Sequence, residues 1–177
     1  RNAFLFFASL FFYYKTSGSY LLLLFFCVSA NFLGGRFLER LQRTKPRIIV
    51  LALLVSVDLF TLGYFKYAYF FLDLLHQLFG IDLKVYNFFA AASNRFLHTN
   101  SLVDQIVLPV GISFFTFQAI SYVVDVYKRT IRPISNFFDF GFYLAFFPAL
   151  VAGPIIRADK FIPQLHRPYF LSHRAFG

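Results

Sequence analysis

Long apolar runs separated by short basic segments constrain this chain more than any other feature. Three runs, residues 20–38, 48–72 and 106–127, approach the roughly 20 mostly apolar residues that a helix needs to cross a bilayer. The chain is 59% hydrophobic and has 29 Phe among 177 residues, more apolar surface than a soluble fold of this size can hide. The sequence therefore predicts an all-α integral membrane protein with several crossing helices.

The remaining segments are shorter or more polar. Residues 2–14 are apolar but too short to cross, so we interpret them as part of a crossing helix. Residues 73–103 contain no apolar window of crossing length and are expected at the interface or in solution, with a short amphipathic helix near residues 86–97. The chain has no Met and starts inside an apolar run, which favours a piece of a longer polypeptide. Residues 1–177 are thus interpreted as one incomplete membrane domain.

Two basic segments predict the orientation. Residues 36–47 carry five cations and a single Glu39, and residues 128–133 carry three cations and no acid. Basic loops stay on the cytoplasmic side of membrane proteins. Two crossing helices are expected between these segments, residues 48–72 outward and residues 106–127 back. Both basic segments would then lie in the cytoplasm. The net charge of +9 is therefore interpreted as membrane orientation, and nucleic acid is not an expected partner.

The apolar segment 137–156 contains residues that interrupt helices. Pro148 removes a helical hydrogen bond, and the Gly153–Pro154 pair disfavours helical backbone. Both flanks are basic, so a hairpin that enters and leaves on one side would keep these charges in the cytoplasm. Interrupted backbone at membrane depth needs protein or water around it. We therefore expect a re-entrant segment beside a wet cavity, with a proline-kinked crossing helix as the alternative.

Polar residues recur along the helix expected at residues 106–127. They are Gly111, Gln118, Ser121, Tyr122 and Asp125. Offsets of seven, three, one and three residues place them on one helical stripe, which must face other helices or a cavity because lipid offers no partners. Contacts between helices are the first interpretation and a functional lining is the second. Asp125 is expected to pair with Lys128 or Arg129.

Few other polar residues are site candidates. Asp58 lies near the middle of the run 48–72, where a carboxylate is costly unless it is paired or in a cavity. Lys66 lies among tyrosines, as is typical of an interfacial anchor. Cys27 is expected to be a packed thiol. The histidines are His76, His98, His166 and His173. None has a metal-ligand spacing to another His or an acid, so no metal site is predicted.

Two stretches are more specific than composition. They are "LPVGISFFTFQAISYVVDVYKR", Leu108 to Arg129, and "FFPALVAGPIIRADKFIPQL", Phe146 to Leu165. Together they resemble the membrane-bound O-acyltransferase family, and within it the alginate O-acetylation branch. Lys128 and Ala149 depart from the family pattern, which more often has Arg and Gln there, so no role is transferred to Ala149.

The resemblance implies a fold and an activity. It implies a multi-helix enzyme of the bacterial inner membrane, with re-entrant elements around a central chamber. Members of this branch move an acyl group, often acetyl, from a cytoplasmic donor to hydroxyls of an exported polysaccharide. The implied partners are the lipid bilayer, the polysaccharide and an extracytoplasmic acetyltransferase, with acyl-CoA or an acyl-carrier protein as donor and no bound cofactor.

The resemblance also limits which residues can be assigned. The family's essential histidine lies well beyond the second stretch and is expected downstream of Gly177, so no catalytic residue is assigned in this chain. A piece of the enzyme ending at Gly177 is expected to be inactive and poorly stable, with Gln118 and Asp125 facing lipid.

The chamber-lining candidates are Gln118, Ser121, Tyr122, Asp125, Gly153, Pro154 and Arg157. Arg157 is interpreted either as a cytoplasmic anchor or as a contact for an anionic donor. A transporter and a non-catalytic scaffold for a polysaccharide-modifying complex are the alternatives to an acyltransferase.

Overall fold

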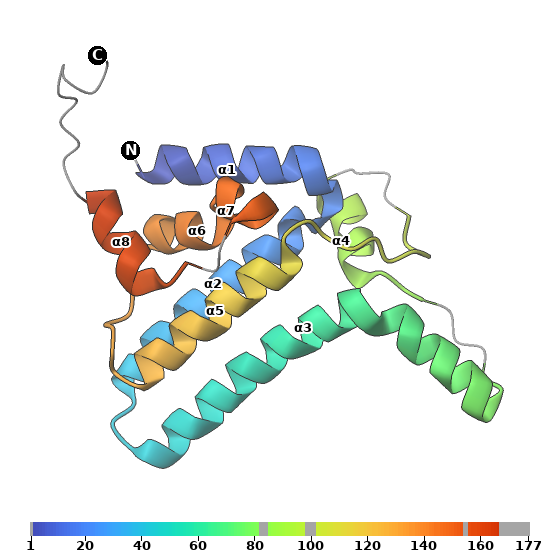
Figure 1. Ribbon diagram of the computed structural model, residues 1–177, viewed down its shortest axis with the longest axis horizontal. Coiled ribbons are helices and arrows are strands. Elements are labelled where there is room, and N and C mark those ends of the chain that lie inside the picture. The colour runs from blue at the N-terminus through green and yellow to red at the C-terminus, as the bar shows by residue number, and fades with distance from the viewer. Residues whose placement is uncertain (1, 82–84, 98–101, 154–155, 167–177) are drawn as a thin grey trace.

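The structure, a computed structural model, describes residues 2–81, 85–97, 102–153 and 156–166 (Figure 1). These residues form helices and no strand. The helices are α1 (Asn2–Ser17), the 3₁₀ helix η1 (Gly18–Tyr20), α2 (Leu21–Arg40), α3 (Thr44–Phe79), α4 (Phe88–Leu97), α5 (Ile112–Tyr127), α6 (Phe137–Ala145), α7 (Phe147–Ala152) and α8 (Ala158–His166). Two of them, α2 with 20 residues and α3 with 36, are long and apolar enough to cross a membrane. The predicted all-α class is confirmed.

The helices pack in layers (Figure 1). α2 and α5 lie side by side and α3 packs against both, while α1 lies on the other side and packs against α6. The core between these layers is rich in aromatic and aliphatic side chains, because burial between helices removes their apolar surface from solvent. Its fully buried members include Leu23, Val28, Phe115, Val123 and Phe140. Cys27 is also buried, which confirms the predicted packed thiol.

The helix ends differ from the predicted boundaries. α5 begins at Ile112, six residues after the expected start at Ile106, because Pro109 and the left-handed Gly111 precede it. α3 continues to Phe79, where the left-handed Gly80 caps it, so the helix extends seven residues beyond the apolar run that was expected to end at residue 72. Helical periodicity persists after the apolar composition ends, so hydropathy alone set the boundary too early.

The predicted basic segment 36–47 is mostly helical. α2 runs through Arg40 and α3 starts at Thr44, which leaves three connecting residues. Arg47 is buried in the first turn of α3, and its guanidinium donates to the carbonyl of Tyr127 at 2.7 Å. This contact places the two basic segments at the same end of the helices, as the orientation argument requires. α4 confirms the short helix expected at residues 86–97, and the Asn87 side chain accepts a hydrogen bond from the backbone of Ala90 at 3.0 Å.

Gly35 allows α2 and α5 to approach closely. A Cβ at Gly35 would lie 2.7 Å from the buried Tyr122 hydroxyl, whereas a Cβ at Gly63 on α3 would meet nothing within 4 Å. Gly35→Ala is therefore expected to lower the free energy of unfolding by about 1–3 kcal/mol, the usual cost of overpacking. Gly63→Ala, the matched control, should raise it by about 0.5–1 kcal/mol through helix propensity. Thermal unfolding of the full-length protein in detergent measures both. Equal effects of the two substitutions would contradict this account of the α2–α5 contact.

Candidate functional site

The apolar segment 137–156 is interrupted, as predicted: helix α7 ends before Gly153, but the first break is at Phe146 instead of Pro148. α6 begins after Asn136, whose side chain accepts from the backbone of Phe138 at 2.9 Å, and it ends at Ala145. The chain leaves helical geometry at Phe146 (φ −59°, ψ 99°) and re-enters it in α7. Pro148 lies in the first turn of α7. Backbone N–H groups in the first turn have no acceptor within the helix, so a proline there removes no hydrogen bond. Gly153 is extended after α7, and Pro154 lies outside the described residues.

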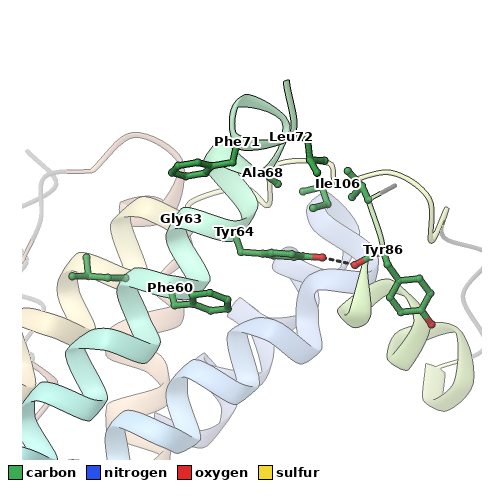
Figure 2. Close-up of a pocket in the computed structure, with 10 residues that line it drawn as sticks. Phe60, Gly63, Tyr64, Ala68, Phe71, Leu72, Tyr86 and Ile106 are labelled. Carbon is green, nitrogen blue, oxygen red and sulfur yellow. Dashed lines mark hydrogen bonds between the residues drawn. The ribbon is translucent and has the colours of Figure 1, made fainter. Parts of the chain in front are cut away.

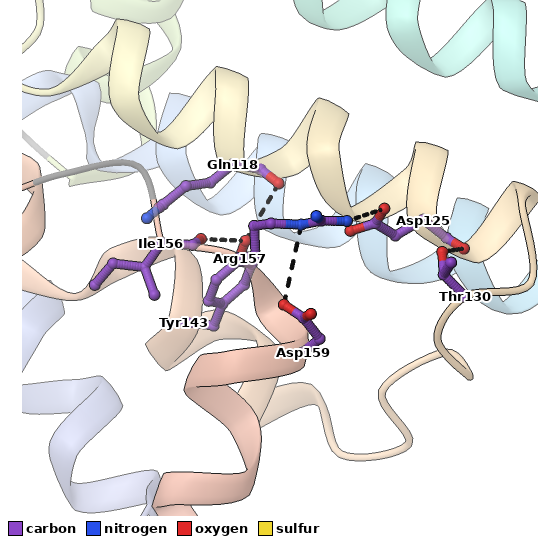
Figure 3. Close-up of polar contacts among 7 residues, drawn as sticks. All are labelled: Gln118, Asp125, Thr130, Tyr143, Ile156, Arg157 and Asp159. Carbon is purple, nitrogen blue, oxygen red and sulfur yellow. Dashed lines mark hydrogen bonds and ion pairs between the residues drawn. The ribbon is translucent and has the colours of Figure 1, made fainter.

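An ion pair links the two specific sequence stretches (Figure 3). Arg157 Nη2 lies 2.7 Å from Asp125 Oδ1, and its Nε lies 4.0 Å from Asp159. The Asp125 side chain is 7% exposed and that of Arg157 is 52% exposed. The hydrogen bond that Arg157 donates to Asp125 raises the pKa of Arg157 above its usual value, so the guanidinium stays positively charged. The prediction that Asp125 pairs with Lys128 or Arg129 is wrong, because the chain turns away after α5 and a later segment supplies the cation.

Tyr143 of α6 holds the backbone that carries this arginine. Its hydroxyl donates to the carbonyl of Ile156 at 2.9 Å and lies 3.5 Å from the carbonyl of Gln118 on α5 (Figure 3). Tyr143 thus connects α5, α6 and the residue before Arg157. Sequence reasoning missed this role, because Tyr143 is one of many aromatic residues in an apolar run.

Buried polar atoms on α5 remain without hydrogen-bond partners in the described part of the chain. They are the Gln118 Oε1, Asp125 Oδ2 and Thr116 Oγ1 atoms. A buried polar atom without a partner costs about 1–3 kcal/mol, so native proteins usually supply one, whether protein, water or ligand. Gln118 and Asp125 are only 2% and 5% exposed, so the expectation that they face lipid in this chain is wrong. Tyr143 of α6 contacts the Gln118 carbonyl, and Arg157, after α7, pairs with Asp125.

The other stripe residues differ in their surroundings. Ser121 is half-buried. Tyr122 is fully buried, and its hydroxyl accepts from the backbone N–H of Ile134 at 3.3 Å. Its described contacts are therefore those of a residue that packs α5 against α2, consistent with contacts between helices as the first interpretation of the stripe.

Asp58 forms a buried polar pair between α2 and α3. The Asn31 Nδ2 atom donates to Asp58 Oδ1 at 3.0 Å and to the Cys27 carbonyl at 3.0 Å. The Asn31 carboxamide oxygen, Oδ1, and the second carboxylate oxygen of Asp58, Oδ2, have no partner in the described part of the chain. The pair lies apart from Arg157 and links two long helices, so it functions in packing. Lys66 is exposed beside the Tyr67 ring, 5.3 Å from its centroid.

This pairing predicts opposite effects for two substitutions. Asp58→Asn retains an acceptor for Asn31 and adds a donor for its unpartnered oxygen, so stability should be unchanged or higher. Asn31→Leu removes the donor from a buried carboxyl and should lower the free energy of unfolding by about 1–3 kcal/mol. Chemical denaturation of the full-length protein in micelles measures both. A strong destabilisation by Asp58→Asn would contradict the pairing.

The histidines form no metal site among the described residues. His166 on α8 lies 3.0 Å from the buried Asp139 on α6, which also accepts from Asn2 at 2.8 Å. This link was missed because the two residues are far apart in sequence and lie on different helices. It fixes α8 beside α6 and so helps to position Arg157.

The catalytic histidine that the resemblance implies is not assigned to any residue of this chain. His76 is exposed near the end of α3, and His166 contacts Asp139. His98, His173 and Gly177 lie outside the described residues. The expectation of a catalytic histidine downstream of Gly177 is not tested by the structure and stays a prediction.

Two apolar grooves lie along α3 near residues 85–89. One has a volume of about 620 Å³ and is lined by residues such as Phe60, Phe71 and Ile106; across it the Tyr64 hydroxyl donates to the Tyr86 carbonyl (Figure 2). The other has a volume of about 790 Å³ and shares Phe60, Tyr64 and Tyr86. Almost every lining group is apolar, so these grooves can hold hydrocarbon but offer no acid–base chemistry.

Curated relatives of this chain are named O-acetyl-transferring proteins. It is 36% identical over 182 residues to the probable alginate O-acetylase AlgI of Pseudomonas aeruginosa, covering all of this chain and 32% of that protein. It is 38% identical over 139 residues to the protein of the same name from Azotobacter vinelandii, covering 76% of this chain and 24% of the relative. It is 30% identical over 186 residues to the peptidoglycan O-acetyltransferase of Helicobacter pylori, covering 89% and 31%.

These matches cover most or all of the chain but only part of each relative. The chain spans about a third of the length of the curated relatives named here, or less. No protein-family model matches the chain, and no solved structure matches it. The resemblance of the two sequence stretches to the alginate O-acetylation branch of the membrane-bound O-acyltransferase family is confirmed: over part of their length, the chain is a homologue of proteins named alginate O-acetylase.

Proposed function

We propose that this chain forms part of a membrane-bound O-acyltransferase that transfers an acyl group, acetyl in the first instance, to hydroxyls of an exported polysaccharide. The names of its relatives support the reaction class. The observation that carries the proposal is the Asp125–Arg157 pair at 2.7 Å, which joins the two family-specific stretches into one polar site beside a helix break. The transporter and scaffold alternatives have no comparable support.

The proposed topology follows from the positions of charge. The ends of α2 and α5 and the start of α3 carry the basic segments, and these face the cytoplasm of a bacterial inner membrane that the protein crosses several times. Residues 137–156 form a re-entrant hairpin, since α6 and α7 are each far shorter than a bilayer is thick. Residues 1–177 act as one domain within the larger enzyme. In this arrangement Arg157 lies at the cytoplasmic mouth of the chamber.

The chemistry divides between this chain and the rest of the enzyme. Acyl transfer from a thioester of coenzyme A or of an acyl-carrier protein needs a general base for the acceptor hydroxyl and donors for the developing oxyanion. We assign neither role to a residue of this chain, and we expect the catalytic histidine downstream of Gly177.

The residues of this chain bind and orient. Gln118 Oε1 and Asp125 Oδ2 are acceptors without partners among the described residues, suited to a substrate N–H or O–H group. Ser121, Tyr122, Gly153 and Pro154 complete the proposed lining.

Deleting the gene tests the proposed function. The exported polysaccharide of the deletion strain should lose its O-acetyl esters, measured as alkali-released acetate, and the intact gene should restore them. The quantity of polysaccharide should not change, because the proposed enzyme modifies the polymer and does not transport it. Unchanged ester content, or loss of the polysaccharide itself, would reject the proposal.

A further inference from the structure

A small polar pocket of about 220 Å³ lies where the end of α5 and the turn at residues 128–133 meet the end of α2 and the start of α3. Its charged lining residues are Glu39, Arg47, Arg129 and Arg132. Three arginines and one glutamate therefore line the pocket, which leaves an excess of positive charge. No ion pair joins Glu39 to these arginines within the part of the chain that the structure describes. The pocket is separate from the Asp125–Arg157 site.

Arg47 is a buried cation without a carboxylate partner among the described residues. It is 5% exposed, and its Nη2 atom donates to the carbonyls of Val126 at 3.3 Å and Tyr127 at 2.7 Å. These carbonyls belong to the last turn of α5, whose dipole offsets only part of a full charge. Burying a charge without a counter-charge is costly. A bound anion would offset this cost.

Arg129 fixes the turn that brings the second and third arginines of the pocket beside Arg47. It has φ 60° and is the one described non-glycine residue in the left-handed region. Residues other than Gly, Asn and Asp adopt this conformation rarely and at a cost in free energy. Here it ends α5: the Arg129 N–H donates to the Val126 carbonyl at 3.1 Å and the Thr130 N–H to the Asp125 carbonyl at 3.0 Å, which is the usual hydrogen-bond pattern of a helix C-cap. Here the outlier is in the turn that lines the pocket.

We propose that this pocket binds a phosphate group. Guanidinium groups bind phosphate through paired, charge-assisted hydrogen bonds, and Arg47 is already held in place by its carbonyl contacts. Two sources present this group at a membrane surface: a phosphate-bearing acyl donor, such as a coenzyme A thioester, and the headgroup of an anionic lipid. The first source rests on the proposed function, whereas the second does not.

Two probes test the pocket on the full-length protein. The first probe is radiolabelled coenzyme A, whose binding is measured with the protein in phosphatidylcholine nanodiscs. The second is labelled phosphatidylglycerol, whose retention by the detergent-purified protein is compared with that of phosphatidylcholine. Arg132→Gln should weaken binding of one probe about tenfold or more, because it removes charge-assisted hydrogen bonds at an exposed position. Glu39→Gln should strengthen the same binding. The responding probe identifies the source of the phosphate.

Arg43→Gln is the matched control. Arg43 is an exposed arginine at the same end of the helices but does not line the pocket, so its loss should leave binding unchanged. Equal weakening by Arg43→Gln and Arg132→Gln would overturn the proposal in favour of general attraction to a basic surface. Binding of neither probe, or binding indifferent to Arg132, would also overturn it. If phosphatidylglycerol binding depends on Arg132 but the deletion strain keeps its polysaccharide acetylation, the phosphate pocket stands and only the proposed function is rejected.

Discussion

Arg157→Gln should lower acetyl transfer by the full-length protein roughly tenfold or more, because displacing a positioning group by about an ångström already costs this much. It should also lower the midpoint of thermal unfolding. The reason is the asymmetry of the pair. Asp125 is 7% exposed and keeps a buried charge when its partner is lost, whereas Arg157 is 52% exposed and can be solvated. Acetate release from the polysaccharide and thermal unfolding in detergent measure the two effects.

The same asymmetry predicts the order of the related variants. Asp125→Asn leaves a half-exposed guanidinium in water and should cost less stability than Arg157→Gln. The double variant Asp125→Asn with Arg157→Gln removes both charges and should be more stable than Arg157→Gln alone. Activity should stay low in all three, since the ion pair between the two stretches is absent. A double variant as unstable as the sum of the single ones would contradict the pairing.

Gly111→Ala should cost more stability than Gly35→Ala or Gly80→Ala. Gly111 has φ 71°, and a Cβ there would lie 3.0 Å from the Leu150 backbone carbonyl and 3.1 Å from its Cβ. Left-handed backbone and overpacking together should cost about 2–4 kcal/mol. Since Leu150 belongs to α7, relief of this contact would move α7 away from α5 and lower acetyl transfer.

Gly80→Ala separates the two contributions. Gly80 also has positive φ, 65°, but a Cβ there would meet nothing within 4 Å. It should therefore cost only the conformational part, about 1–2 kcal/mol, and leave acetyl transfer unchanged. Chemical denaturation and acetate release compare the two variants. A cost for Gly111→Ala no larger than that for Gly80→Ala would show that the approach of Leu150 is unimportant.

Apolar composition predicted the helices better than it predicted their ends. The runs 20–38 and 48–72 became α2 and α3, because apolar side chains drive burial wherever helical periodicity also holds. The start of α5 was readable from Pro109 and Gly111, both of which interrupt helices, yet the uncharged run concealed it. The extension of α3 through residues 73–79 could not be predicted from hydropathy, because a helix can continue through polar residues.

Pairings between distant residues could not be predicted from spacing. Three residues of the stripe, Gln118, Tyr122 and Asp125, are buried, but the partner of Asp125 lies 32 residues away, beyond two short helices. Arg47 was interpreted as a loop cation, yet the closure of α2, α3 and α5 buries it against the carbonyls of α5. Such partners follow from the three-dimensional packing, whereas hydropathy and local spacing report only single segments.

Transfer of labelled acetyl in inverted membrane vesicles tests the central claim most directly. The vesicles contain the full-length protein and polysaccharide, and labelled acetyl-coenzyme A is supplied outside with cytosol, which provides an acyl-carrier protein if one is needed. Wild-type vesicles should place alkali-labile label on the polysaccharide. Arg157→Gln should reduce it roughly tenfold or more, and Asp58→Asn should not reduce it. Equal labelling by wild type and Arg157→Gln would contradict the assignment of the Asp125–Arg157 site to acyl transfer.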